Sequence, residues 1–207
     1  MNFKSSYLWI FIIWLFNVSG IIGIYLGFED WFISLTPLNL IISLLAILVV
    51  ESSFNFKRIV PYLVPFAIGM IAEMLGVNYG LLFGNYAYGA NLGPKIAGVP
   101  WMIGVNWAIL TYASATIARH WFKNLWASAF TGAALMLTLD LLLEISAPRF
   151  DYWEFQNGIV PLQNYIAWFG LGLLANYIFQ RLTSQGNILL AVNIYLAFFT
   201  FFAIFAM

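Results

Sequence analysis

Three carboxylic acids stand inside otherwise apolar stretches of this chain: Glu73, Asp140 and Glu144. A charged side chain at the centre of a bilayer costs about 2.5–3.5 kcal/mol on insertion scales, so acids in such stretches usually serve a function. Asp140 and Glu144 are four residues apart, which places both side chains on one face of a helix. Acids in apolar surroundings without a cation favour their neutral, protonated form. The sequence therefore predicts a site that donates protons.

Composition defines the class of protein that must position these acids. Of 207 residues, 63% are hydrophobic and 8% are charged, which is typical of a polytopic membrane protein. A helix needs about 20 apolar residues to cross the hydrocarbon core. We predict an all-α fold with a single transmembrane domain over 1–207, in which about seven helices cover 7–27, 35–51, 61–77, 100–118, 125–145, 162–180 and 187–207. Prolines mark four of the predicted helix starts: Pro37, Pro61, Pro100 and Pro161.

The composition also excludes several kinds of chemistry. The chain has no cysteine, which rules out disulfides, thiol catalysis and thiolate metal sites, and its one histidine makes a histidine-based metal site improbable. We therefore expect no metal site. Net charge is zero and no basic tract is present, so no nucleic-acid partner is expected.

The basic residues predict an orientation in the membrane. If seven helices cross the membrane, six of the basic residues fall on the side of the N-terminus: Lys4, Lys57, Arg58, Arg119, Lys123 and Arg181. Only Lys95 and Arg149 fall on the other side. Because basic residues favour the cytoplasmic side, we predict a multi-pass protein of the inner (plasma) membrane with a cytoplasmic N-terminus and an extracytoplasmic C-terminus.

Glu73 and Asp140 are predicted to lie at matching depth. They stand about four and five residues from the outer ends of 61–77 and 125–145, or roughly 6–8 Å below one interface at 1.5 Å per residue. The two longest loops open on the same side and are rich in aromatic residues, so we expect them to fold as a lid. Candidates to line a pocket there are Tyr79, Tyr86, Tyr88, Trp107 and Trp153, and candidates to hold water are Asn78, Asn85, Asn106 and Asn164.

Such a site suits a hydrocarbon substrate. A neutral carboxylic acid in a dry pocket can protonate a carbon–carbon double bond and generate a tertiary carbocation. Aromatic faces and a nearby carboxylate stabilise the cation, and water can then trap it.

Two blocks of sequence support this interpretation. The first runs from Glu73 to Trp107 and contains G-V-N-Y-G-x-x-F-G-N-Y-x-Y and L-G-P-K-I-A-G-V-P; the second runs from Asp140 through Glu144 and Pro148 to Trp168. Together they resemble the integral-membrane carotenoid biosynthesis protein family, which contains CruF-type carotenoid 1,2-hydratases and bisanhydrobacterioruberin hydratase. The likeness covers roughly 60–180. At Glu144 the family often has an Asp-Pro pair instead.

The resemblance implies an activity and a role for each acid. The protein would add water to the terminal C1=C2 double bond of a linear, lycopene-like carotenoid without a cofactor. Asp140 or Glu73 would protonate C2, the other would orient the attacking water or accept its proton, and Glu144 would tune the pair. The expected partners are the carotenoid substrate, membrane lipid and other enzymes of the carotenoid pathway.

Three alternatives stay open at this point. A membrane lycopene cyclase would use the same protonation but exclude water. A proton-coupled transporter would also bury acids, although it would normally show inverted repeats or broken helices at mid-membrane. Interhelical carboxylate hydrogen bonds can simply hold helices together, but at about 0.6 kcal/mol each they hardly offset the cost of inserting three acids.

Overall fold

Eight helices and four short strands make up the computed structural model, which describes residues 3–51, 56–184 and 186–207, with side chains from 6–51, 58–184 and 186–207. The helices are α1 (Phe3–Tyr25), α2 (Glu29–Ser34), α3 (Thr36–Val50), α4 (Phe56–Tyr79), α5 (Trp101–Trp121), α6 (Leu125–Ser146), α7 (Leu162–Leu182) and α8 (Ile188–Phe205). The strands are β1 (Tyr86–Tyr88), β2 (Lys95–Ile96), β3 (Val99–Pro100) and β4 (Trp153–Phe155). The predicted all-α class is confirmed, and each predicted helix is present.

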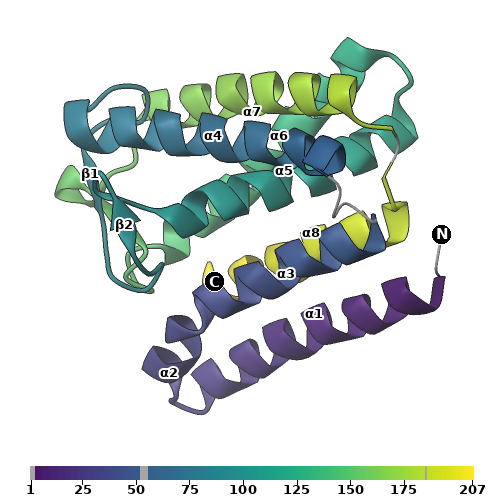
Figure 1. Ribbon diagram of the computed structural model, residues 1–207. Helices are drawn as coiled ribbons and strands as arrows, with labels where there is room; N and C mark the ends of the chain where they lie inside the picture. The colour runs from purple at the N-terminus through teal and green to yellow at the C-terminus, as the bar shows by residue number, and fades with distance from the viewer. Residues whose placement is uncertain (1–2, 52–55, 185) are drawn as a thin grey trace.

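The helices pack around α5, which is buried along most of its length and contacts α3, α4, α6, α7 and α8. In Figure 1, α4, α6 and α7 lie on one side of α5, and α1, α3 and α8 lie on the other. In the part of the chain that the structure describes, four helices are long and apolar enough to cross a membrane: α1, α4, α6 and α8. The chain is therefore polytopic, and the count of seven crossings stays a prediction.

Two details of the helices differ from the prediction. The short helix α2 fills the gap between α1 and α3, where no helix was expected. Pro61 was expected to begin a helix, but α4 begins at Phe56 and holds both Pro61 and Pro65 in its interior. Apolar helices packed in a bundle tolerate such prolines because neighbouring groups satisfy the carbonyls that the ring leaves free.

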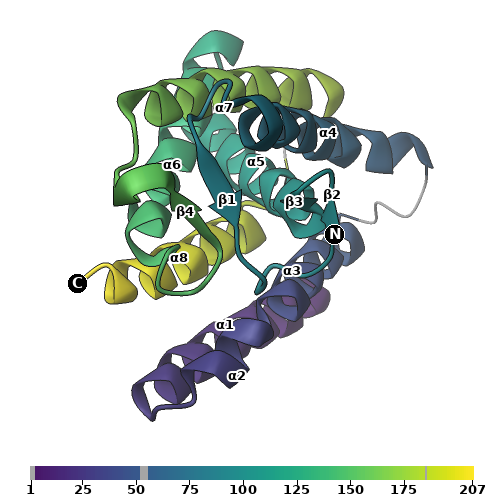
Figure 2. The same ribbon diagram turned by 90° about the vertical axis from the view of Figure 1, so that its left-hand side faces the viewer.

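The two long connections pair with each other. Strand β1, from the connection between α4 and α5, runs antiparallel to β4, from the connection between α6 and α7. The register places Tyr86 opposite Phe155 and Tyr88 opposite Trp153. Figure 2 shows β1 and β4 side by side across one end of the bundle, which we call the strand end. The predicted lid thus has a structural counterpart in this two-stranded sheet.

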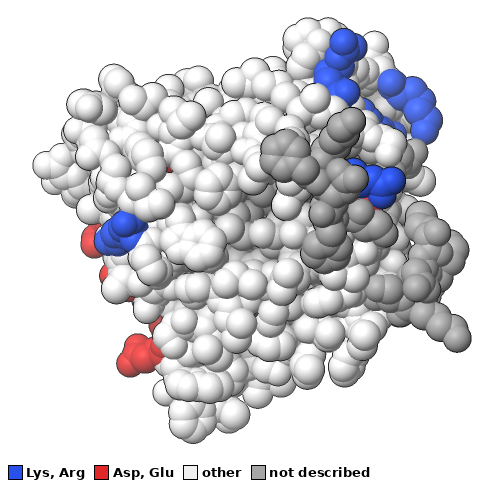
Figure 3. Space-filling model, in the orientation of Figure 1, with Lys and Arg blue, Asp and Glu red and all other residues white. Residues whose placement is uncertain are grey.

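Charge divides the two ends of the bundle. In Figure 3, most Lys and Arg atoms gather near the end that holds the N-terminus, most Asp and Glu atoms lie near the strand end beside one smaller blue patch, and a largely uncharged belt separates the two ends. Arg58, Arg119 and Arg181 lie at helix ends opposite the strand end, while Lys95 and Arg149 lie at the strand end. The side chains of Lys4 and Lys57, which also entered the predicted asymmetry, lie outside the described residues.

Candidate active site

The three predicted acids meet in one small cavity at the strand end. Glu73 comes from α4, and Asp140 and Glu144 come from α6. Their side chains are buried, with 4%, 2% and 6% of the surface exposed. Glu73 lies six residues before the end of α4 and Asp140 six residues before the end of α6, so both stand about 9 Å along the axis from those ends. The two acids therefore lie equally far from the ends of their helices, and their depth in a membrane stays a prediction.

Two tyrosines hold Glu73. The hydroxyls of Tyr86 and Tyr88, both on β1, donate hydrogen bonds to Oε2 of Glu73 at 2.5 and 2.7 Å. Burial and the Glu73 carboxylate together raise the pKa of both tyrosine hydroxyls well above its ordinary value. The two hydroxyls therefore stay protonated and act as donors to this one carboxyl oxygen.

Glu144 and Asp140 differ in how many of their carboxyl oxygens accept hydrogen bonds. Glu144 Oε2 accepts from the indole N–H of Trp153 at 2.9 Å, and Oε1 accepts from the Asn164 amide at 3.0 Å. The same amide lies 3.4 Å from Oδ2 of Asp140, whereas Asp140 Oδ1 is buried and has no hydrogen-bond partner among the described residues. Asp140 is therefore the acid with an oxygen free to meet a ligand.

Glycines on α4 make room around Glu73. A Cβ atom at Gly69 would lie 2.3 Å from the Trp107 ring, and one at Gly76 would lie 2.7 Å from the Tyr86 hydroxyl oxygen. Because these glycines precede and follow Glu73 by about one helical turn, both aromatic residues can approach the face that carries the acid. Trp107 stacks on Trp168, with ring centroids 4.5 Å apart, and closes that side of the cavity.

The cavity has a volume of about 20 Å³, which is enough for one water molecule. Its walls offer Asp140 Oδ1, which has no hydrogen-bond partner among the described residues, together with the Asn106 amide and the Trp107 indole N–H, which lies close to the Glu73 carboxyl group. A cavity that offers a carboxyl oxygen and N–H donors suits a bound water, which both donates and accepts hydrogen bonds. Among the described side chains, none of the three acids forms a salt bridge with Lys or Arg. Arg149 instead pairs with Glu29 at the surface.

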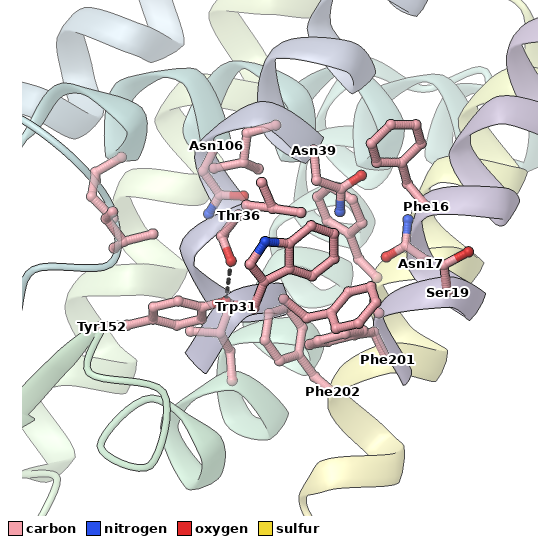
Figure 4. Close-up of a pocket in the computed structure, with 18 of the residues that line it drawn as sticks. Phe16, Asn17, Ser19, Trp31, Thr36, Asn39, Asn106, Tyr152, Phe201 and Phe202 are labelled. Carbon is pink, nitrogen blue, oxygen red and sulfur yellow. Dashed lines mark hydrogen bonds between the residues drawn. The ribbon is translucent and has the colours of Figure 1, made fainter. Parts of the chain in front are cut away.

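A larger cavity lies directly beside the acids, and we call it the chamber. It has a volume of about 340 Å³ and is lined mainly by apolar side chains from α1, α2, α3, α5, α6, α8 and the segment around β4. Figure 4 shows Trp31, Phe201 and Phe202 around it, with the amides of Asn17, Asn39 and Asn106 at its edges. Four residues line both the chamber and the acid cavity: Ile103, Asn106, Leu143 and Trp153.

Most of the predicted site residues come together. The acid cavity is lined by Glu73, Tyr86, Tyr88, Asn106, Trp107, Asp140, Glu144, Trp153 and Asn164. Three predicted residues lie outside it. Asn78 donates to the carbonyls of Met74 and Ala97, and Tyr79 is 73% exposed. Asn85, predicted to hold water, is exposed and also lies outside the cavity. These residues are therefore placed where they do not contact the cavity, which corrects their predicted position.

Sequence reasoning missed the residues of the chamber and several aromatic walls. Phe83, Phe155 and Trp168 line the acid cavity, and Thr36 bonds the Tyr152 hydroxyl at 2.7 Å beside the chamber. Asn17 and Asn39 lie within apolar helices, and an amide in such a position was the one signal in the sequence that pointed to this region.

Comparison with known proteins shows the family to which the chain belongs. The family model for carotenoid biosynthesis proteins matches residues 35–207, and the chain belongs to that family. It is also similar to bisanhydrobacterioruberin hydratase of Haloarcula japonica, with 28% identity over 116 residues. That match covers 52% of this chain and 40% of the relative. No solved structure matches the chain. The protein is thus a membrane-embedded member of the carotenoid biosynthesis family.

Proposed function

We propose that this protein is a carotenoid hydratase that adds water to the terminal C1=C2 double bond of a linear carotenoid. The observation that carries the proposal is the convergence of three carboxyl groups on a cavity with room for one water, beside a large apolar chamber. Membership in the carotenoid biosynthesis family and the similarity to a named hydratase support the substrate class.

Asp140 is the group best placed to donate the proton, because its Oδ1 has no other partner among the described residues. The proton from Asp140 forms a C–H bond at C2 and leaves a tertiary cation at C1. Aromatic faces stabilise a cation within about 6 Å of the ring centre, and Trp107, Trp153 and Trp168 line the cavity.

Glu73 then receives the proton that water loses as its oxygen bonds to C1. The two tyrosine donors on Oε2 stabilise Glu73 as a carboxylate, which leaves Oε1 to orient the water. A proton transfer from Glu73 back to Asp140 restores the starting state. The sum of the steps is the addition of one water, so the reaction needs no oxidant, reductant or cofactor.

The rival activity is cyclisation, in which the same cation closes a ring. A cavity that accommodates a single water and offers it polar partners favours capture by water instead. Expression in a host that accumulates lycopene distinguishes the two. We expect products heavier by one water per reacted end, whereas unchanged mass with altered absorption would indicate a cyclase, and unchanged pigment would contradict both.

Two isosteric variants test the roles of the acids. Asp140→Asn and Glu73→Gln keep the shape of the side chains but remove the transferable protons, and each is expected to lower conversion at least about 100-fold, the usual contribution of general acid–base catalysis. The measurement is product formed per amount of purified protein. Full activity in both variants would eliminate the acid mechanism.

A further inference from the structure

The acid cavity is too small for the substrate that the proposed function requires. About 20 Å³ holds one water, whereas the end of a carotenoid is a branched hydrocarbon of several carbon atoms. The reacting end must therefore occupy a neighbouring space and gain access to the acids. The chamber is the space that adjoins them, across the wall of Ile103, Asn106, Leu143 and Trp153.

The chamber has the properties that a hydrocarbon chain needs. At about 340 Å³ it matches the volume of ordinary ligand sites, and its lining is predominantly apolar. Two lining residues, Leu15 and Trp31, are 49% and 60% exposed, so the chamber extends to the molecular surface. They lie on α1 and α2, and α1 is one of the helices able to cross a membrane. A chain dissolved in lipid can enter there without crossing water.

Trp153 is the part of the shared wall best able to move. Ile103 and Asn106 are on α5 and Leu143 is on α6, two helices held in the packed centre of the bundle. Trp153 is on the three-residue strand β4, which pairs only with β1. Its side chain is held in the wall by ring contacts and by the hydrogen bond from its indole N–H to Glu144 Oε2 at 2.9 Å.

We propose that the chamber binds the end of the polyene chain and that Trp153 separates it from the acids as a gate, which Glu144 holds closed. This inference rests on the proposed function and assigns Glu144 a positioning role. Both Glu144 oxygens already accept hydrogen bonds, from Trp153 and Asn164, while Asp140 has an oxygen free. Rotation of the Trp153 side chain joins the two cavities and lets the double bond reach Asp140 and the water.

The chamber is tested by filling it. In the Asp140→Asn protein, which cannot convert substrate, lycopene retained through purification in detergent is measured by absorbance per protein. Ser19→Phe places a ring in the chamber and is expected to lower retention about tenfold. Val18→Phe adds the same ring at a position 42% exposed and outside the chamber, and is expected to retain lycopene fully. Equal retention in both variants would overturn the chamber assignment.

This measurement is independent of the reaction. Retention that depends on Ser19 but no gain of water by the unmodified protein would support the chamber and contradict the hydratase. Hydration of lycopene with retention unaffected by Ser19→Phe would support the hydratase and contradict the chamber.

The gate is tested through Glu144. Glu144→Leu and Trp153→Phe each remove the hydrogen bond that holds the gate closed, so the substrate should reach the acids more readily and kcat/KM is expected to rise about tenfold, the scale of one hydrogen bond to a charged group. Glu144→Gln keeps an oxygen that can accept from the Trp153 indole, so its rise in kcat/KM is expected to be smaller than that of Glu144→Leu. Because Glu144→Leu and Trp153→Phe remove the same bond, the double variant should rise no further than either single one. A lower kcat/KM in both single variants, or additive rises, would overturn the gate, as would loss of all activity in Glu144→Gln, which would make Glu144 a proton donor.

Discussion

Two tyrosine hydroxyls on a single carboxylate oxygen give Glu73 a different environment from Asp140. Tyr86 and Tyr88 both bond Oε2, and neither contacts the acids on α6 by a hydrogen bond. Such paired donors stabilise a carboxylate, whereas the unpartnered oxygen of Asp140 suits a protonated acid. Under the proposed function, the two acids thus take different roles because of their neighbours, not because of their residue type.

If Glu73 is the base of the proposed reaction, removing its tyrosine donors should weaken it. We expect Tyr86→Phe and Tyr88→Phe each to lower the rate of hydration about tenfold, because each deletes one hydrogen bond to a charged group. Tyr7→Phe, at a side chain 61% exposed and remote from the cavity, is the matched control and should leave the rate unchanged. Rates are measured at equal amounts of folded protein; unaltered rates in both cavity variants would remove Glu73 from the mechanism.

Residue types and spacing were enough to predict the acids and most of the cavity, but not the direction of Asn78 and Tyr79. The sequence predicted a helix that ends at residue 77, which would leave both residues free to fold back over Glu73. Instead α4 continues to Tyr79. At 100° per residue these side chains turn away from the face that carries Glu73. An error of two residues in a helix boundary decided their position.

At the scale of the elements, α4 and α5 approach closely because glycine lies where the rings must pack. Gly69→Ala brings a Cβ atom to 2.3 Å from the Trp107 ring, so the ring or the helix must shift. We expect a loss of about 1–3 kcal/mol of stability, the usual cost of overpacking. Gly170→Ala on α7 meets no atom within 4 Å and should not destabilise the protein. Thermal unfolding in detergent compares the two, and equal midpoints would contradict this packing.

The pairing of β1 with β4 is the element-scale feature that the sequence did not reveal. The aromatic content of both connections predicted ordered structure, but the register depends on contacts between residues more than sixty positions apart. Local patterns carry no information about such pairing. The helices were easier to predict, because apolar runs of about 20 residues have one main solution in a membrane.

A cross-link tests the register directly. Ala87 and Glu154 are exposed and opposite each other in the strand pair, where Cα atoms lie about 4.5–5.5 Å apart. Since the chain has no cysteine, Ala87→Cys combined with Glu154→Cys should form one intramolecular disulfide under mild oxidation, detected by mass. Each single cysteine variant is the control. Failure of the double variant to cross-link would indicate a different register.

For the whole molecule, the charge asymmetry predicts which end faces the cytoplasm. Lys123 and Glu154 are both exposed and lie at opposite ends of the bundle. We expect a membrane-impermeant thiol reagent to label Glu154→Cys in intact cells, provided that any outer membrane is made permeable, and to label Lys123→Cys only after the inner membrane is opened. The reverse pattern would invert the proposed orientation, and labelling of both from outside would contradict the count of seven crossings.

The chamber could not be predicted at this scale, because it exists only once helices from both halves of the chain are assembled. Its residues come from α1, α2 and α3 on one side and from α5, α6 and α8 on the other. Each helix looks like an ordinary apolar segment on its own. The acid cavity was easier to anticipate, since its main components lie in two contiguous blocks that the family likeness already joined.

The placement of all three acids near one end of the bundle bears on substrates with two identical ends. A linear carotenoid is about as long as the hydrocarbon core is thick, roughly 30 Å, so while one terminus is held beside Asp140 the other lies toward the far leaflet. To modify both termini, the enzyme must release the half-finished molecule and rebind it after it has turned over in the bilayer. Under the proposed function, this protein therefore works distributively, and an asymmetric mono-alcohol becomes a free membrane intermediate that other enzymes can intercept.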